Sequence, residues 1–221
     1  MIPPTRWYLL RHAPAKVGKG TVYGRTDVPA LLQDPALINR IAARLPPESL
    51  LITTPLRRTT ETAEMLEAAG WAPRDQMVEA AFAEQDFGTW EGTTHDALSQ
   101  EGSADYMAFW NNPARNRPPG GESFADLMVR ASAAFTTLTE AHPARDIVLI
   151  GHSGSIRAIV ATILGLSPEN ALALEIAPLS LSLIDYAGGG EATGALSPWR
   201  VRGFNIVDRF QPQKAGIASF Q

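Results

Sequence analysis

The sequence contains no cysteine, and this absence excludes several kinds of chemistry. A chain without cysteine forms no disulfide bonds, binds no zinc through thiolates and has no cysteine nucleophile. Histidine is scarce as well, and the four that occur are His12, His95, His142 and His152. No group of histidine, aspartate and glutamate residues has the spacing of metal ligands, so we predict neither a metal site nor a cofactor.

Long apolar segments are also missing. No apolar run reaches the length of a membrane span, and the N-terminus lacks the apolar h-region of a signal peptide, so we expect a cytoplasmic protein without a membrane partner. The net charge of −4 and the pI of about 5.6 argue against nucleic acid as a partner. Most basic residues are arginines, which suit phosphate or carboxylate groups. We therefore expect a small-molecule partner, while the sequence carries no signal of oligomeric state.

Strand-like apolar segments alternate with helical patterns along the chain. The expected strands lie at 5–11, 50–53, 77–82, 147–150, 179–186 and 199–205, and the expected helices at 34–45, 57–69, 124–141 and from about 152 to 164. This alternation predicts an α/β fold, a three-layer αβα sandwich with a mainly parallel central sheet. We expect one domain over 1–221, with an irregular insertion or lid at about 93–122 and a polar C-terminal tail after about 208 that frays.

Two helix ends carry local signals. Ser123 is a predicted N-cap, and Asp126 three residues later completes the pattern of a capping box. Gly165 is expected to end the helix that precedes it.

The expected first strand ends in Arg11 and His12. A strand that simply reaches solvent would explain this pair, but in parallel sheets ligands bind beyond the carboxyl ends of the strands. A histidine is a nucleophile when its ring is neutral and one nitrogen is free, and neighbouring arginines lower its pKa and hold an anion close to it. A second histidine, His152, follows another strand, which favours a functional interpretation.

Three further segments could contribute to one site. Arg57 and Arg58 begin a helix after a strand, where guanidinium groups and the helix N-terminus suit an anion, although a solvated arginine pair is the alternative. Residues 84–92 hold three carboxylates among aromatic residues, and one of them could be a general acid, without any indication of which. Residues 151–157 offer glycines and a helix start but not a P-loop, because no lysine precedes the serine.

Together these segments resemble the histidine phosphatase superfamily, which includes the cofactor-dependent phosphoglycerate mutases. Four motifs occur in the family's order: Arg11-His12-Ala13 resembles Arg-His-Gly, residues 54–58 resemble Ser-Pro-Leu-x-Arg, residues 84–92 resemble Glu-x-x-x-Gly-x-Trp-Glu-Gly, and residues 151–157 resemble Gly/Ser-His-x-Gly-x-Ile-Arg. They span about two-thirds of the chain. The resemblance implies a phosphoglycerate mutase-like fold and a metal-independent phosphatase.

The resemblance also implies a role for each residue of the site. His12 would become phosphohistidine, and Glu84 would protonate the leaving oxygen. Arg11, Arg58 and His152 would bind the phosphate. Predicted substrate-binding residues are, in addition, Tyr23, Gly24, Arg25 and Ser153.

Two departures from the family pattern concern the phosphate site. Ala13 replaces the usual glycine, and the polar residues that usually follow it are missing. Lys16 or Lys19 could supply a phosphate contact in their place.

Residues 23–29 and 118–124 look like the α-ribazole phosphatase branch, an activity of cobalamin biosynthesis. The resemblance therefore implies a phosphomonoester hydrolase, with α-ribazole 5′-phosphate as a possible substrate. A phosphoglycerate mutase, a broad-specificity phosphatase and, in a different class, a non-catalytic phosphate-binding or scaffold protein are the alternatives. Trp110 in the insertion could stack on a ring of the leaving group or anchor the loop in its own core.

Overall fold

A computed structural model describes residues 3–100, 104–188 and 197–207. The predicted tail after about 208 lies outside this range. The described residues form a six-stranded sheet in the order β3-β2-β4-β1-β5-β6. The strands are β1 (Thr5–Arg11), β2 (Leu50–Thr53), β3 (Asp75–Val78), β4 (Asp146–Gly151), β5 (Leu181–Tyr186) and β6 (Trp199–Ile206).

The sheet is mixed, with a parallel part and an antiparallel edge. β1, β2, β3 and β4 run parallel, whereas β5 and β6 pair antiparallel. The register places Arg11 opposite Gly151, so β1 and β4 end at the same level. The two histidines that follow these strands are therefore brought to one place. The prediction of a mainly parallel sheet is confirmed.

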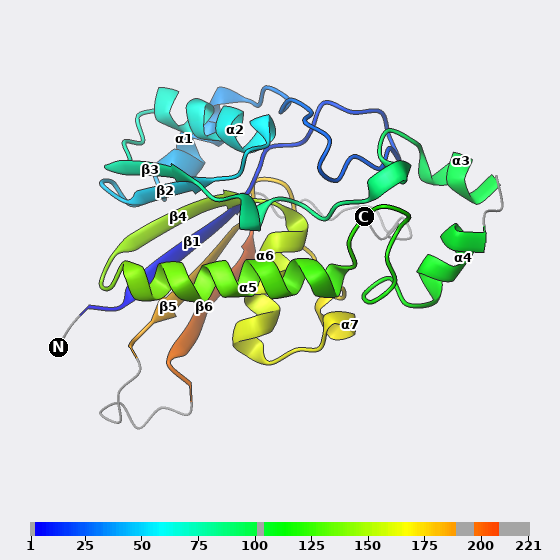
Figure 1. The fold of residues 1–221 in the computed structure, drawn as a ribbon. Coiled ribbons are helices and arrows are strands. Elements are labelled where there is room, and N and C mark those ends of the chain that lie inside the picture. The colour runs from blue at the N-terminus through cyan, green and yellow to red at the C-terminus, as the bar shows by residue number, and fades with distance from the viewer. Residues whose placement is uncertain (1–2, 101–103, 189–196, 208–221) are drawn as a thin grey trace.

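Helices cover both faces of the sheet and confirm the three-layer sandwich (Figure 1). One face carries α1 (Pro35–Ala42) and α2 (Arg57–Ala68), and the other carries α5 (Phe124–Ala141) and α6 (Ser153–Leu164), with the short α7 (Pro168–Ala171) next to α6. Among the helices of the described residues, none has the length and apolar character needed to cross a bilayer.

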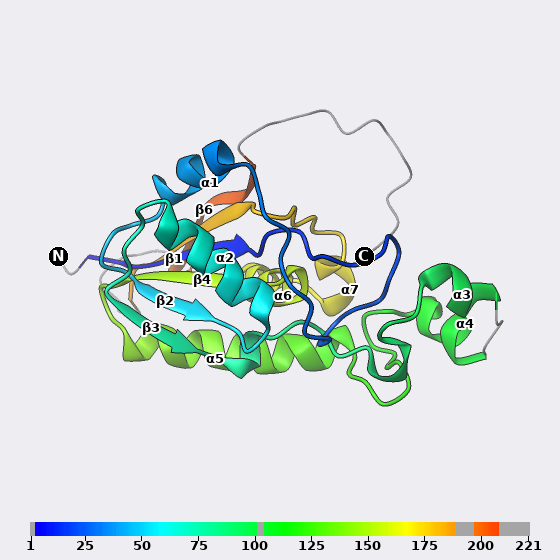
Figure 2. The same cartoon turned by 90° about the horizontal axis from the view of Figure 1, so that it is seen from above.

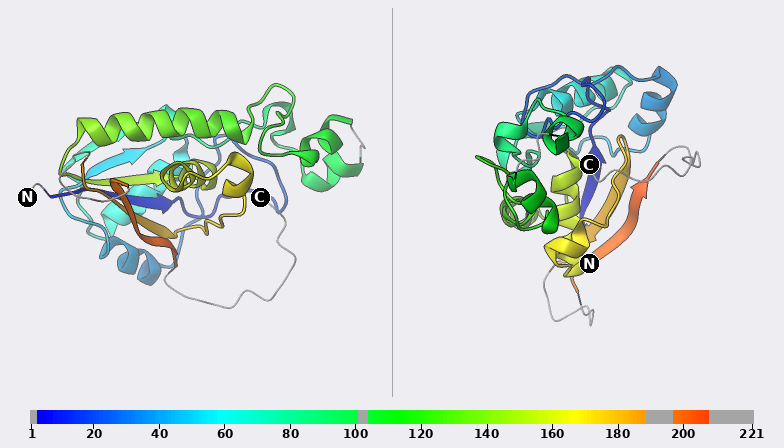
Figure 3. Two further views of the ribbon diagram at one scale, coloured as in Figure 1. Left: turned by 90° about the horizontal axis from the view of Figure 1, so that it is seen from below. Right: turned by 90° about the vertical axis from the view of Figure 1, so that its right-hand side faces the viewer.

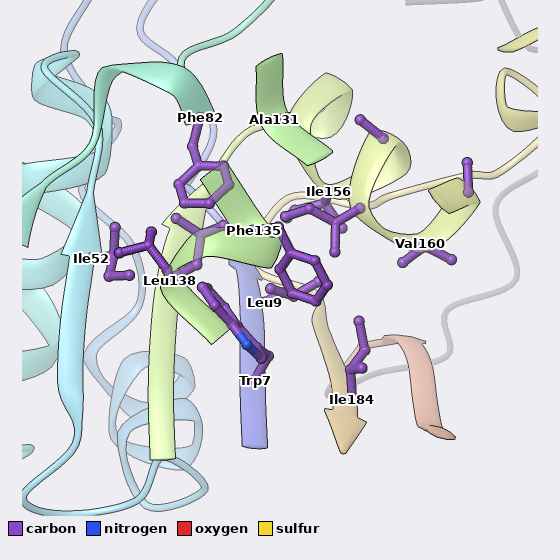
Figure 4. Packing of buried hydrophobic residues seen from close by; sticks show 14 of the residues in the cluster. Trp7, Leu9, Ile52, Phe82, Ala131, Phe135, Leu138, Ile156, Val160 and Ile184 are labelled. Atoms are coloured by element: carbon purple, nitrogen blue, oxygen red, sulfur yellow. The ribbon is translucent and has the colours of Figure 1, made fainter. Parts of the chain in front are cut away.

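Alternate residues of β1 pack into two separate cores, as the period of a strand requires. Trp7 and Leu9 belong to the cluster beneath α5 and α6, while Leu10 belongs to the cluster beneath α1 and α2. Figure 4 shows Trp7 close to Phe82 and Phe135 in the first cluster. The Trp7 indole N–H donates to Thr139 Oγ1 at 3.0 Å, so its one polar atom is satisfied in the core.

The insertion is more regular than predicted. Within 93–122 the structure has α3 (His95–Gln100) and α4 (Ala104–Asn111), and irregular backbone follows only where the prolines begin, at Pro113. Figures 2 and 3 show that α3 and α4 lie beyond the ends toward which the parallel strands point. They share a small aromatic cluster with Val22 and Trp90, so the insertion has a core of its own. α3 has too few residues to show an apolar period, and the apolar residues of α4 face both the cluster and solvent.

The predicted helix caps are confirmed. Ser123 Oγ accepts from the Asp126 N–H, and the Asp126 carboxylate accepts from the Ser123 N–H. Gly165 ends α6 with φ of 66°, in the left-handed region that favours glycine. The strand predicted at 77–82 is wrong in its second half: β3 ends at Val78, and a 3₁₀ turn (Ala80–Phe82) follows, capped by the Glu79 side chain.

Candidate active site

His12 and His152 lie side by side beyond the ends of β1 and β4. Their ring centroids are 5.1 Å apart, and the residues are 1% and 0% exposed. The His12 N–H donates to the Gly151 carbonyl at 3.0 Å, which continues the β1–β4 ladder past the last strand residue. The register of β1 on β4 therefore brings together two histidines that are 140 residues apart in the sequence.

Hydrogen bonding fixes the tautomer of His12. Its Nδ1 lies 2.6 Å from the Ala13 carbonyl oxygen. A carbonyl oxygen only accepts, so Nδ1 carries the hydrogen and Nε2 keeps its lone pair. Burial lowers the pKa of His12 well below its ordinary value, and the charges of Arg58 and Arg11 lower it further. The ring is therefore neutral at neutral pH, and the Nε2 lone pair is free.

Arg11 and Arg58 place two guanidinium groups near this nucleophile. Arg11 Nη1 donates to the Ile176 carbonyl, and Arg58 donates to the carbonyls of Gly24 and Thr26. Among the described residues, neither arginine has a carboxylate within 4.0 Å, and the Nε atom of each has no hydrogen-bond partner. Arg58 is fully buried and Arg11 is partly buried, and a guanidinium group that no carboxylate pairs with directly suits an anion such as phosphate.

The two adjacent arginines of α2 have different environments. Arg58 is fully buried, and its guanidinium lies 5.2 Å from the centre of the Tyr23 ring. Arg57 is exposed and pairs with Glu61 at 2.8 Å. The alternative of a solvated arginine pair therefore describes Arg57 but not Arg58.

His152 is the N-cap of α6 and is also neutral. Its Nε2 lies 2.9 Å from Thr54 Oγ1, and within the described structure its Nδ1 has no partner. Burial lowers its pKa well below the ordinary value, with further contributions from His12 and the neighbouring arginines. The next residue, Ser153, has a buried hydroxyl that likewise lacks a partner among the described atoms.

The structure separates the three carboxylates of residues 84–92. Glu84 Oε1 accepts from the Gly154 N–H at 3.0 Å, which places this carboxylate at the start of α6 beside His152. Asp86 accepts from Gly88 within its own turn, and Glu91 binds the backbone of Arg25. Glu84 is thus the member of the set that lies next to the histidine pair.

The predicted substrate-binding loop at residues 23–25 is only partly directed to the site. Gly24 has φ of 26°, and an added Cβ would lie 2.3 Å from Glu91 Oε1, so only glycine fits. Its carbonyl holds Arg58, whereas Arg25 forms ion pairs with Glu122 and Asp86 at 3.4 and 3.9 Å.

A cavity of about 640 Å³ adjoins the site and extends beneath α4. Arg11, Tyr23, Gly24, Glu84, Ser153 and Arg157 line its inner part, and aromatic residues including Trp90, Tyr106, Phe109 and Trp110 line the rest. The lining does not include the buried residues His12, Arg58 and His152, which lie behind it. It also lacks Arg25 and the exposed Lys16 and Lys19. Nothing in the described structure supports the prediction that either lysine replaces the missing polar residues.

Sequence reasoning assigned no role to several polar residues that hold the site together. Thr54 contacts His152, and Thr62 Oγ1 accepts from the Ala13 N–H at 3.0 Å. Arg157, inside a motif but without a role, lines the cavity, and Arg130 binds the Glu84 loop. A polar residue on a largely buried helix face is the signal that could have indicated Thr62 and Arg157, whereas Thr54 lies in the turn between β2 and α2 and carries no such signal. Across the part of the chain that is described, no group of three or more acidic or histidine side chains could hold a metal.

Comparisons with known proteins agree on one family. The model of the histidine phosphatase superfamily, branch 1, matches residues 7–197. A probable phosphoglycerate mutase GpmB of Klebsiella pneumoniae is 28% identical over 203 residues, which cover 90% of this chain and 89% of that protein. The α-ribazole phosphatase of Shigella flexneri has a similar fold, with a TM-score of 0.77 at 22% identity over 91% of this chain and 96% of that chain. The mycobacterial glucosyl-3-phosphoglycerate phosphatase Rv2419c gives a TM-score of 0.73 at 25% identity, over 92% and 99%.

Proposed function

Because the chain belongs to the histidine phosphatase superfamily, we propose that it hydrolyses phosphomonoesters through a phosphohistidine on His12. The observation that carries this proposal is the state of His12: a buried, neutral ring with Nε2 free, next to two guanidinium groups without carboxylate partners. Such a nitrogen can attack phosphorus while the arginines hold the phosphate oxygens.

The reaction would take two steps. In the first, His12 Nε2 attacks phosphorus, the bond from phosphorus to the ester oxygen breaks, and protonated Glu84 gives its proton to that oxygen. In the second, water attacks the phosphorus of phosphohistidine, and the bond between phosphorus and His12 Nε2 breaks. Glu84 takes a proton from the water, and inorganic phosphate leaves. Arg11, Arg58 and His152 would stabilise the charge on the phosphoryl oxygens in both steps.

The cavity favours a bulky leaving group that contains a ring. Its volume of about 640 Å³ lies in the usual range for small-molecule sites, and seven phenylalanine, tyrosine and tryptophan residues line it. A leaving group that reaches from Glu84 to Trp110 could stack on these rings. We therefore propose a ring-bearing phosphomonoester, of which α-ribazole 5′-phosphate is the representative to test.

One observation favours a second candidate, a phosphoglycerate-type substrate with phosphatase or mutase activity. Arg157 lines the cavity, donates to the Leu174 carbonyl through Nε, and has no carboxylate within 4.0 Å among the described side chains. A carboxylate on the leaving group would supply a negative charge to pair with Arg157. The two candidates are separated by comparing kcat/KM for α-ribazole 5′-phosphate and 3-phosphoglycerate.

The proposed chemistry is tested by trapping the intermediate. Rapid quench with a ³²P-labelled phosphomonoester should give an acid-labile, base-stable phosphoprotein in the wild type. The same label should appear in His142→Ala, a histidine control outside the site, and be absent in His12→Ala. The assay is run with and without EDTA, and equal labelling is expected because arginines supply the positive charge. Turnover by His12→Ala near the wild-type rate would refute the mechanism.

A further inference from the structure

Arg130 binds the main chain around Glu84 from α5. Its Nη1 donates to the carbonyls of Ala81 and Ala83 at 2.6 and 2.9 Å, and its Nη2 donates to the Glu84 carbonyl at 3.1 Å. These three carbonyls belong to the turn that delivers Glu84 to the site. One rigid guanidinium group thus fixes the path of this turn.

Glu122 holds Arg130 in place. Arg130 Nε and Nη2 donate to the two carboxylate oxygens of Glu122 at 3.0 and 2.5 Å. The two side chains are only 20% and 17% exposed, so this is a partly buried bidentate pair. An arginine side chain has five N–H donors, and the five contacts of Arg130 account for all of them.

Glu84 is therefore fixed at both ends. Arg130 holds its main chain, and the start of α6 holds its carboxylate through the Gly154 N–H. Arg130 is not among the residues that line the cavity, so its hydrogen bonds reach the reaction only through Glu84. Its charge makes the smallest contribution to the lowered pKa of His152, after burial, His12 and the two arginines of the site. A pair needed for folding alone would not have to bind the three carbonyls next to Glu84, the proposed proton donor.

We propose that Arg130, oriented by Glu122, is a positioning residue that sets the placement of Glu84 for proton donation. This inference rests on the proposed function of Glu84 as general acid. It predicts that loss of Arg130 impairs only reactions whose leaving group needs a proton. Phosphoryl transfer from esters with good leaving groups should continue, because His12 and its arginines keep their contacts.

The test compares an alkyl phosphate with p-nitrophenyl phosphate, whose leaving group is stable without a proton. The quantity measured is kcat/KM, which reports the steps up to phosphoryl transfer. For Arg130→Gln we expect a loss of about 10²-fold for the alkyl ester, as for a misplaced catalytic group, and little change for the aryl ester. Arg117→Gln is the matched control, since it breaks an exposed bidentate pair with Asp126 that makes no hydrogen bond to the carbonyls of residues 81–84. It should change neither value.

Two further variants keep the outcome decisive. If Arg130→Gln does not fold, Glu122→Gln should reproduce the selective loss for the alkyl ester. Glu84→Gln measures the effect of removing the general acid altogether, typically about 10²–10⁴-fold. Two outcomes would overturn the positioning role, provided that Glu84→Gln still slows the alkyl ester more than the aryl ester. They are equal losses for both esters in Arg130→Gln, and no loss for either ester. If Glu84→Gln itself is unselective, the proposed acid fails and the inference fails with it.

Discussion

At the scale of the residue, the absence of a side chain at position 154 leaves room for the carboxylate of Glu84, the proposed proton donor. A Cβ added to Gly154 would lie 2.2 Å from Glu84 Oε1 and 2.9 Å from Leu127 Cδ1. Both distances are below van der Waals contact, and the Leu127 side chain is fully buried and cannot easily move. The carboxylate of Glu84 would have to move instead.

Gly154→Ala should therefore displace the Glu84 carboxylate without touching His12. We expect kcat/KM to fall by about 10²-fold for an alkyl phosphate and much less for p-nitrophenyl phosphate. Gly165→Ala, at the other end of α6, is the control: its Cβ would meet nothing within 4 Å, but its φ of 66° is strained for alanine. It should lower the melting temperature and leave the ratio of the two esters unchanged. A similar ratio in both variants would contradict the steric explanation.

At the scale of the element, α4 closes the cavity with aromatic residues. Trp110 packs on Phe109 and Tyr106 at centroid distances of 5.3 and 6.0 Å, is 37% exposed, and also lines the cavity. It thus anchors α4 and at the same time presents a ring surface to the site. Both interpretations of Trp110 that the sequence left open have support in its contacts.

Trp110→Ala should weaken a substrate whose leaving group stacks on this ring. Base–aromatic stacking contributes about 1–3 kcal/mol, so kcat/KM for α-ribazole 5′-phosphate should fall between about fivefold and 150-fold. Hydrolysis of p-nitrophenyl phosphate should stay close to the wild-type rate. Met107→Ala is the matched control on α4, because Met107 is 60% exposed and does not line the cavity. Equal effects on both esters would indicate that Trp110 only anchors the helix.

At the scale of the whole molecule, the two buried histidines make stability depend on pH. In the unfolded chain a histidine has a pKa of about 6.5, whereas in the folded protein the pKa values of His12 and His152 lie well below this, chiefly because of burial. Between the two values the unfolded chain binds a proton that the folded protein does not. Lowering the pH through this range therefore favours unfolding.

Urea denaturation should show this dependence directly. The free energy of unfolding should be constant above pH 7 and fall below about pH 6.5, with a slope that approaches about 1.4 kcal/mol per pH unit for each histidine. His152→Asn should remove the contribution of one histidine and give a shallower slope. A free energy that stays constant from pH 7.5 to 5.5 would show that these rings are not buried in the neutral form.

Local patterns in the sequence were sufficient for much of the fold. The apolar period of residues 124–141, the Ser123 cap and the stop at Gly165 all depend on neighbours within a few positions, and all three are confirmed. The alternation of strands and helices likewise predicted the layers and placed Arg11, His12 and His152 at strand ends. The short helix α3 escaped prediction because six residues do not establish a period. α4 was missed because its apolar residues, such as the buried Phe109 and the exposed Met107, do not lie on one face.

By itself, then, the sequence determined the family, the layered fold and the residue types available for chemistry. The family resemblance singled out Glu84 and Arg58, whereas the residues alone left the choice among their neighbours open. The tertiary structure supplies the contacts: Glu84 lies at Gly154, and Arg58 is buried beside Tyr23. It also brought Arg130 to the Glu84 turn, 46 residues away in the chain. The physical reason is that these contacts depend on strand register and on how helices cross the sheet, and neither leaves a trace in the pattern of adjacent residues.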